Sequence, residues 1–177
     1  MIGRAAATAP EAERRRVFSR LVDRDLDRAY RLAGVILGNG ADAEDATHDA
    51  VVRAWRSFGA LRDLDRFEPW FQRILVNTCR DRLRKNKRQP VTELRIASGG
   101  SVTGGFGAVD DRLALDRAFA RLSPDQAITI VLRFHADLKV EDVAARMGVP
   151  VGTVKSRLHT ALGVLQLALS GPEVIDR

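Results

Sequence analysis

The sequence predicts an all-α protein made of two small helical domains joined by a flexible, glycine-rich linker. Apolar residues recur at steps of three and four along most of the chain, which is typical of amphipathic helices, and no period-two alternation is long enough for a sheet. Between the two helical halves, the stretch GGSVTGGFG holds five glycines in nine positions. A length of 177 residues suits one domain or two small ones.

The first half begins with a tail and a long helix. Residues 1–11 are alanine-rich and lack periodicity, so we expect a mobile N-terminal tail. Apolar residues then recur at helical spacing from Phe18 to Ile36, after which two glycines end the first predicted helix. Asp42 is predicted to cap the second helix, with Asp45 three residues later in the position of a weaker capping box.

The second and third predicted helices follow in this half, which is predicted to be a domain of three or four helices. The inward face of the second helix is a stripe of small residues that ends in a tryptophan: Ala43, Ala46, Ala50, Ala54 and Trp55. This helix is predicted to end at Phe58-Gly59. The third helix starts around Phe67 and runs towards Lys85, where basic residues suit the negative end of the helix dipole.

The second half is predicted to contain four helices. The first of these has one apolar face, formed by Leu115, Ala118, Phe119 and Leu122. The next begins at Ser123-Pro124-Asp125-Gln126, where the serine is a cap, the proline occupies the first helical position, and the glutamine completes a capping box. Ala127, Val131 and Phe134 are predicted to continue inward along it.

The segment Val140–Leu158, VEDVAARMGVPVGTVKSRL, predicts two short helices that cross at a tight turn, a helix-turn-helix. Gly148 supplies the positive φ that ends the first helix. Three residues of the second part, Val149, Val154 and Leu158, face inward. The outward residues of the second helix suit phosphates and base edges in a major groove: Thr153, Lys155, Ser156, Arg157 and His159. An ordinary helical hairpin packed into a core is the alternative.

The chain therefore divides into five predicted segments. Residues 1–11 are the N-terminal tail, 12–88 the first domain, 89–109 the linker, 110–170 the second domain and 171–177 the C-terminal tail. Ala161, Leu162, Leu165 and Leu167 prolong the last helix towards the end of the second domain.

Charge and cysteine content limit the classes of function. The net charge is +6 and the sequence pI is about 10.4, which favours a polyanionic partner such as nucleic acid or an anionic membrane surface. The sequence lacks an apolar run approaching ~18 residues and a secretion leader, so we expect a cytoplasmic chain without membrane insertion. Cys79 is the only cysteine, which excludes an internal disulfide and a thiol cluster for zinc.

The C-terminal end of the third helix is strongly basic, because residues 80–88 hold six cations and one carboxylate. A solvated helix terminus is the simplest explanation of such a run. However, Arg73, Asn77, Arg80, Asp81 and Arg84 share one helical face, and aromatic residues precede them. A cationic face beside aromatic rings can follow a phosphate backbone and stack unpaired bases.

An acidic group marks the second helix, with Asp42-Ala-Glu-Asp45 followed one turn later by Asp49. A metal site is the less favoured alternative, because no nearby histidine or second carboxylate cluster completes a coordination sphere. An acidic patch in a basic, nucleic-acid-binding chain is better suited to docking a basic partner protein. The histidines have no paired spacing, and neither a nucleophile elbow nor a phosphate-binding loop appears, so we expect no catalysis, no cofactor and no metal.

Taken together, these segments resemble a bacterial alternative sigma factor of the extracytoplasmic-function type. The DAED helix and the run FEPWFQRILVNTCRDRLRKNKR resemble sigma region two, and LSPDQAITIVLRFHADLKVEDVAARMGVPVGTVKSRL resembles region four. The similarity covers about Phe18–Arg88 and Asp110–Leu167. It implies a promoter-specificity subunit that binds core RNA polymerase, directs it to −10 and −35 elements, and assists strand opening.

The resemblance also implies partners and site residues. The partners are core RNA polymerase through its β′ clamp helices and its β subunit, promoter DNA as duplex at −35 and as an opened strand at −10, and an anti-sigma factor. The residues implied for docking on the polymerase are Asp42, Asp45, His48, Asp49 and Arg53. Those implied for the −10 element are Phe67, Trp70, Arg73, Asn77, Arg80, Asp81 and Arg84. Those implied for the −35 element are Thr153, Lys155, Ser156, Arg157, His159 and Thr160.

The sequence departs from the family pattern at several positions. His48 stands where glutamine is usual, Ala127 where arginine is common, and Lys139 where a serine often caps a helix. Thr160 begins a stretch that is often Arg-Ala-Arg in relatives. Two other classes remain open from the residues: a helix-turn-helix regulator that acts without polymerase, and a sigma-mimicking adaptor that binds an anti-sigma protein.

Overall fold

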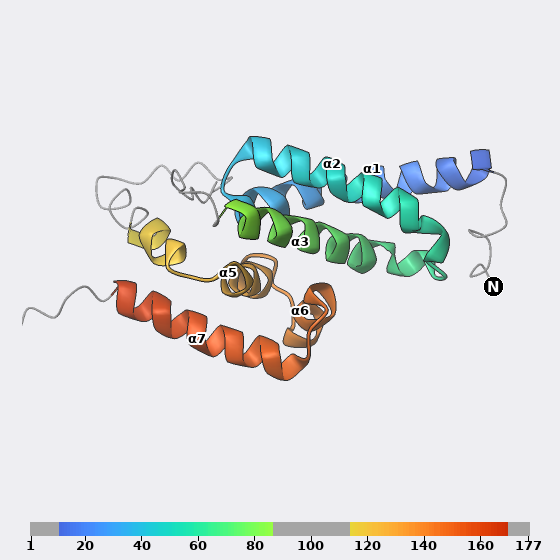
Figure 1. Ribbon diagram of the computed structural model, residues 1–177. Coiled ribbons are helices and arrows are strands. Elements are labelled where there is room, and N and C mark those ends of the chain that lie inside the picture. Colours follow the sequence, from blue (N-terminus) through green and yellow to red (C-terminus); the bar gives the residue numbers. More distant parts are fainter. Residues whose placement is uncertain (1–10, 87–113, 170–177) are drawn as a thin grey trace, which may run out of the picture.

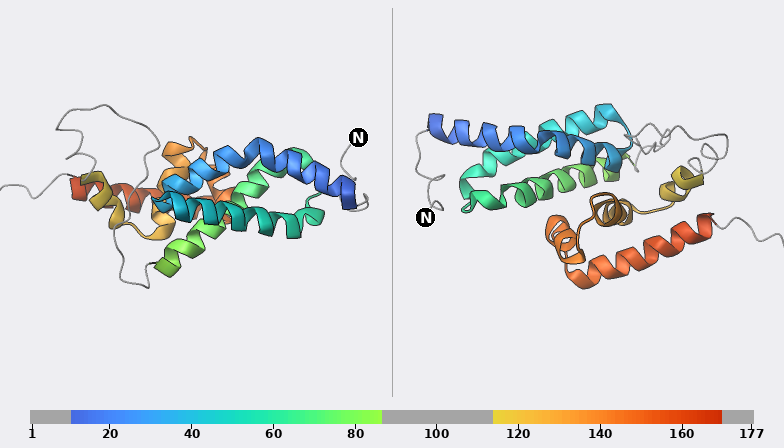
Figure 2. Two further views of the ribbon diagram at one scale, coloured as in Figure 1. Left: turned by 90° about the horizontal axis from the view of Figure 1, so that it is seen from above. Right: turned by 180° about the vertical axis from the view of Figure 1, so that it is seen from behind.

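The computed structural model describes residues 11–86 and 114–169, which form two layers of helices (Figure 1). One layer contains α1 (Glu11–Leu37), α2 (Gly40–Ser57) and α3 (Phe67–Asn86). The other contains α5 (Pro124–Ile130), α6 (Val140–Met147) and α7 (Val151–Leu169), preceded by a helical segment at 114–120. Figure 2 shows the same two layers from behind. The all-α prediction is confirmed, because the described residues contain no strand.

Three of the predicted segments cannot be compared with the structure. The predicted linker at 89–109 and the predicted tails at 1–11 and 171–177 lie outside the described residues, except that α1 already includes Glu11. The boundaries 12–88 and 110–170 stay predictions.

The core of the first layer combines small and aromatic side chains. The four alanines of the α2 stripe are fully buried, and they allow α2 to approach its neighbours closely. At the far end of the layer, Phe18, Phe58 and Phe67 pack edge to face with ring centroids 5.1–6.2 Å apart. Aromatic pairs in this arrangement stabilise a core beyond the area that they bury.

The start of α2 differs from the prediction. The cap is Asn39, whose side chain accepts a hydrogen bond from the Asp42 backbone N–H at 2.7 Å. Asp42 therefore lies inside the first turn, where its charge suits the positive end of the helix dipole. Sequence reasoning placed the cap too late because asparagine and aspartate are both good caps, and only the backbone geometry at Asn39 distinguishes them.

The second layer contains the predicted capping box. Ser123 accepts a hydrogen bond from the Gln126 backbone N–H at 3.3 Å, and the Gln126 side chain accepts one from the Ser123 N–H at 2.8 Å. A π-helical turn at Val131–His135 then follows α5 directly. Such a turn is wider than α and rotates the later side chains, which explains why Phe134 is 57% exposed although it was predicted to face inward.

The helix-turn-helix is confirmed as local structure. α6 ends at Gly148, whose φ of 65° lies in the left-handed region, and α7 begins three residues later. Val154 is fully buried, while Val149 and Leu158 are partly buried against the core, as predicted. Towards its end, α7 buries only one side: Ala161 and Leu165 are buried, whereas Leu162 and Leu167 are exposed.

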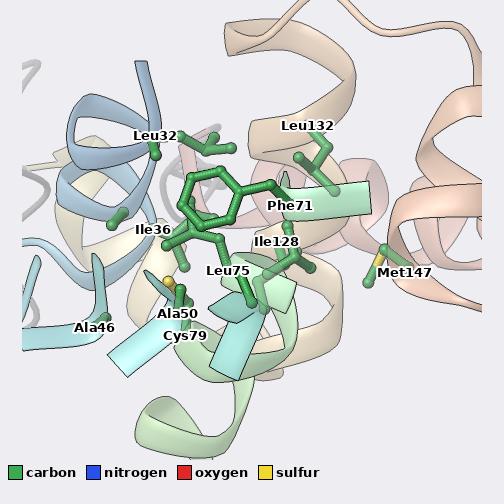
Figure 3. Close-up of a cluster of buried hydrophobic side chains, with 14 of the residues drawn as sticks. Leu32, Ile36, Ala46, Ala50, Phe71, Leu75, Cys79, Ile128, Leu132 and Met147 are labelled. Carbon is green, nitrogen blue, oxygen red and sulfur yellow. The ribbon is translucent and has the colours of Figure 1, made fainter. Parts of the chain in front are cut away.

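The two layers share one apolar core, which the sequence did not predict. Phe71 and Leu75 of α3 lie against Ile128, Leu132 and Met147 of the second layer (Figure 3). All five side chains are at most 2% exposed. The halves are therefore packed face to face.

Cys79 lies in this shared core with no exposed surface. Burial raises the pKa of its thiol to about 12, although the nearby Arg82 charge acts in the opposite direction. Only the thiolate is an efficient nucleophile, so at pH 8 the folded chain should react with a thiol reagent at least ~1,000-fold more slowly than the unfolded chain. Absorbance after addition of a disulfide reagent, with and without denaturant, measures this ratio. Equal rates would show that the core opens freely.

Candidate nucleic-acid interface

The residues predicted for the −10 element line α3, and several of them face the second layer. The Arg80 guanidinium donates a hydrogen bond to the Met147 carbonyl at 3.2 Å and another to the Asn77 side chain at 3.0 Å. Arg73 lies beside Gly148, so closely that a methyl group added at the glycine would come within 3.1 Å of an Arg73 nitrogen. The turn of the helix-turn-helix thus rests on the basic face of α3.

Asp125 is the centre of the charged contacts between the layers. Its carboxylate lies 2.9 Å from Arg80 Nε, 3.1 Å from an Arg84 nitrogen and 3.0 Å from an Arg157 nitrogen. The first two arginines belong to α3 and the third to α7. A single carboxylate therefore contacts cations predicted for the −10 set and for the −35 set.

Arg80, Asp125 and Arg157 of this cluster are largely enclosed but incompletely hydrogen-bonded, whereas the Arg84 side chain is 56% exposed. Burial lowers the pKa of the Arg80 guanidinium, while the Asp125 charge acts to raise it. The contact from Arg80 Nε is an ion pair rather than an aligned hydrogen bond, and the buried Arg157 Nη1 has no hydrogen-bond partner among the described residues. Buried charged groups that lack part of their hydrogen bonding are costly to keep in a low-dielectric environment.

Arg146 forms a second polar contact between the layers, and sequence reasoning missed it. This α6 arginine donates a hydrogen bond to the Gln72 side chain and lies 3.5 Å from a Glu68 carboxylate oxygen, both on α3. It is only 7% exposed. The only signal in the sequence was the position of Arg146, a cation near the C-terminal end of an otherwise apolar helix face. A solvated arginine at a helix end gives the same pattern, so the sequence could not distinguish the two.

The aromatic residues of the −10 set occupy different environments. Phe67 is fully buried and stacks on Phe71 with a centroid distance of 5.6 Å. It is therefore a core residue and is no longer a candidate for contact with DNA. Trp70 is half-buried and packs against Phe67 at 5.7 Å. Asp81 is exposed and pairs with Arg53 of α2 at 3.4 Å, away from the contacts with the second layer.

The −35 set lies along α7 and is mostly accessible. Lys155, Ser156, His159 and Thr160 are exposed, and Thr153 is half-buried. The hydroxyl of Thr160 donates a hydrogen bond to the Ser156 carbonyl at 3.0 Å. Arg157 is the exception, since its guanidinium donates a hydrogen bond to the Asp125 carboxylate at 3.0 Å.

The acidic stripe of α2, defined as Asp42, Asp45 and Asp49, surrounds one arginine of α3. Arg82 lies 3.8, 3.4 and 2.7 Å from these carboxylates in that order. Burial acts to lower the pKa of Arg82. The pKa is nevertheless raised, because Asp49 contributes a hydrogen bond and a negative charge and Asp45 contributes a second negative charge. The Asp45 and Asp49 side chains remain 70% and 49% exposed, so the stripe still presents negative charge to solvent.

His48 lies apart from this stripe. It lines an apolar groove of about 360 Å³ between α1 and α2, together with Val22, Leu26, Tyr30 and Val51. Leu26 and Tyr30 are exposed. Sequence reasoning did not find this groove, because Leu26 fits the apolar periodicity of α1 and so resembles a core residue.

Two negative findings concern the described ranges alone. In residues 11–86 and 114–169, no group of three or more histidine, cysteine, aspartate and glutamate side chains is arranged to hold a metal ion. Over the same ranges, none of the helices combines the length and the apolar character that crossing a membrane requires.

Two families match this chain. Sigma-70 region 2 matches residues 21–89, and Sigma-70, region 4 matches residues 112–164. The ECF RNA polymerase sigma factor SigM of Mycobacterium tuberculosis is 34% identical over 147 residues, which cover 83% of this chain and 74% of SigM. The RNA polymerase sigma factor SigV of Bacillus subtilis is 33% identical over 144 residues, which cover 80% of this chain and 84% of SigV.

Solved structures agree with these families. The sigma factor RpoE of Bartonella quintana, in complex with the anti-sigma factor NepR, aligns with a TM-score of 0.65 at 26% identity, covering 90% of this chain and 98% of RpoE. CnrH, in complex with the cytosolic domain of CnrY, aligns with a TM-score of 0.64 at 23% identity, covering 94% of each chain, and shows the shared fold.

Proposed function

The chain belongs to the extracytoplasmic-function sigma factors, which direct RNA polymerase to promoters, and from this we propose which of its surfaces performs each part of that work. The chain would act in the cytoplasm and have no active site of its own. An anti-sigma factor would regulate it, a proposal supported by the complex of the similar sigma factor RpoE with the anti-sigma factor NepR.

Docking on core polymerase is assigned to α2. The acidic stripe and Arg53 face solvent beside Arg82, and His48 extends the surface towards the apolar groove. The exposure of Asp45 and Asp49 supports this assignment, because charged groups near an interface steer association only when they are accessible. The proposed partner surface is the β′ clamp helices.

Contacts with the −10 element are assigned to α3. The proposed residues are Trp70, Arg73, Asn77, Arg80, Asp81 and Arg84. They combine an aromatic surface, amide groups and guanidinium groups on one helix, which is the combination that holds an unpaired strand. Phe67 supports Trp70 from the core instead of reaching the DNA.

Contacts with the −35 element are assigned to the exposed side of α7. The second helix of a helix-turn-helix places its N-terminal residues in the major groove. Thr153, Lys155 and Ser156 occupy that position, and Arg157, His159 and Thr160 follow.

One observation carries this proposal: a single chain presents an acidic helix, a basic helix and a helix-turn-helix. A plain regulator needs only the last of these. Run-off transcription with purified core polymerase tests the proposal on a template with −10 and −35 elements selected from the chain's own transcripts. Transcripts that require both the chain and the core support it. A chain that binds the duplex but gives no transcripts would favour a regulator, and a chain that binds only an anti-sigma protein would favour an adaptor.

Thr160→Arg should tighten −35 binding and sharpen the preference for guanine at one base pair. An arginine can contact guanine through two hydrogen bonds worth ~1–3 kcal/mol of discrimination, whereas a threonine has one short hydroxyl. Selection from a promoter library with both proteins measures the two preferences. Leu167→Arg, nearly two turns further along α7 and 78% exposed in the wild type, is the control for an added charge. Identical −35 profiles for Thr160→Arg and wild type would show that residue 160 lies outside the groove.

A further inference from the structure

We propose that a cavity between α1, α3 and the end of the π-helical turn binds a nucleoside phosphate, with its phosphate on Arg28 and Arg31. The cavity has a volume of about 400 Å³ and receives side chains from both layers. Cavities of ~300–1,000 Å³ where two structural units meet are common sites for small ligands. The inference goes beyond the proposed function, because none of the lining residues is assigned there to DNA or to polymerase.

The charges around the cavity favour an anion. Arg28 and Arg31 of α1 line it, and Arg31 is exposed and forms no ion pair in the part of the chain that the structure describes. Among the described residues, Glu68 is the one carboxylate in the lining, and it lies 3.9 Å from Arg28 and 3.5 Å from Arg146. Its negative charge is therefore already shared, and Arg31 is left with a planar pair of donors that matches a phosphate.

Two further side chains offer hydrogen-bond donors to the same cavity. Gln72 of α3 is 7% exposed, and its side-chain oxygen accepts a hydrogen bond from Arg146. The amide NH₂ group is consequently the part of Gln72 that can donate to a ligand. His135, exposed at the end of the π-helical turn, supplies an imidazole N–H from the second layer.

The remaining wall suits a ligand that is larger than a bare phosphate. Leu32, which is 4% exposed, lines the cavity together with the partly buried Ala136 and Leu138. Asp137 has a φ of 49°, in the left-handed region, and in this turn both of its neighbours line the cavity. Guanidinium groups beside an apolar wall can hold a phosphate and cover one face of a nucleoside at the same time.

Isothermal titration calorimetry of the full chain tests the ligand class at constant ionic strength. The probes are adenosine diphosphate, guanosine diphosphate, the two matching nucleosides and inorganic pyrophosphate. We expect a diphosphate to bind more tightly than pyrophosphate, which leaves the apolar wall uncovered, and more tightly than its uncharged nucleoside. Pyrophosphate or a nucleoside that binds as tightly as the diphosphates would overturn the assigned class. Absence of binding by both diphosphates at ~5 mM would overturn the site.

Substitutions test the location of the site. Arg31→Ala should weaken diphosphate binding at least ~10-fold, the loss expected for a hydrogen bond to a charged group. His135→Ala should also weaken it, whereas His135→Gln keeps an N–H donor and should retain most of the affinity. Both wild-type side chains are exposed, so we expect these variants to fold.

Arg20→Ala is the matched control for the loss of charge. Arg20 is exposed on the same helix, about three turns before Arg31, and does not line the cavity. This variant should bind the diphosphate as the wild type does. Equal weakening by Arg20→Ala and Arg31→Ala would reveal a general effect of charge and would overturn the site.

Duplex binding and transcription separate this inference from its alternatives. Arg31→Ala and Arg20→Ala should bind a labelled DNA duplex equally well. Loss of duplex binding by Arg31→Ala alone, with unchanged diphosphate binding, would assign the arginine to DNA and overturn the cavity site. Run-off transcripts from a chain that binds no diphosphate would overturn the site alone, and diphosphate binding by a chain that gives no transcripts would overturn the proposed function alone.

Discussion

A chain that carries Asp45→Lys and Asp49→Lys is expected to lose its binding to core RNA polymerase. The two side chains are 70% and 49% exposed on α2, so they are available for an intermolecular contact. Loss of a hydrogen-bonded charge contact at an interface costs about 2–5 kcal/mol, and even the lower value weakens binding ~30-fold. Co-purification with core polymerase and a titration of labelled protein measure the loss.

The contact with Arg82 requires a compensated version of this experiment. Two lysines beside Arg82 would repel it and could disturb the packing of α2 on α3. Adding Arg82→Glu restores opposite charges within the chain while keeping the reversed charge on the surface. The triple variant should have wild-type helical content by circular dichroism and should still fail to bind the polymerase.

Arg82→Ala is the matching single variant. It removes the internal cation but leaves the acidic stripe in place, so it should retain polymerase binding. Native affinity in the triple variant would refute the docking assignment. If Arg82→Ala loses binding while the triple variant retains it, the arginine, and not the acidic stripe, makes the contact with the polymerase.

Phe71→Ala is expected to destabilise the whole chain by about 3–5 kcal/mol, the usual cost of truncating a buried aromatic residue. Phe71 is 1% exposed, stacks on Phe67 and packs against the second layer, so its loss leaves a cavity at the centre of the shared core. Because domains of this size are stable by only about 5–15 kcal/mol, the variant should be partly unfolded near physiological temperature.

Chemical denaturation followed by circular dichroism measures this effect. Phe134→Ala is the matched control, because Phe134 is 57% exposed on the π-helical turn and its truncation should change stability by less than ~0.5 kcal/mol. A Phe71 variant that is as stable as this control would mean that the two layers are not packed through α3.

The local structure could be predicted well because its signals are local. The capping box at Ser123 and the left-handed Gly148 each depend on a few neighbouring residues, and both are present as expected. The errors were also local in origin. Asn39 and Asp42 are equally good caps, and the π-helical turn that exposes Phe134 breaks the periodicity from which its burial was inferred.

The candidate site could be predicted only one surface at a time. The sequence indicates the basic face of α3 and the outward face of α7 separately, since each follows from the period of one helix. It does not indicate that Asp125 joins Arg80 to Arg157, because these residues meet only through tertiary packing. Periodicity contains no information about which helix faces which. The same reason explains why Arg146 and the groove beside Tyr30 were missed.

The shared core also determines what fragments of this chain can be used for. A fragment that ends within 89–109 would retain Phe71 and Leu75 but lose the side chains that cover them. The complementary fragment would bring Leu132 and Met147 into water. Contiguous apolar surface of this kind promotes self-association. Solubility and oligomeric state measured on either half alone would therefore describe an uncovered surface, and biochemical work on promoter binding should use the intact chain.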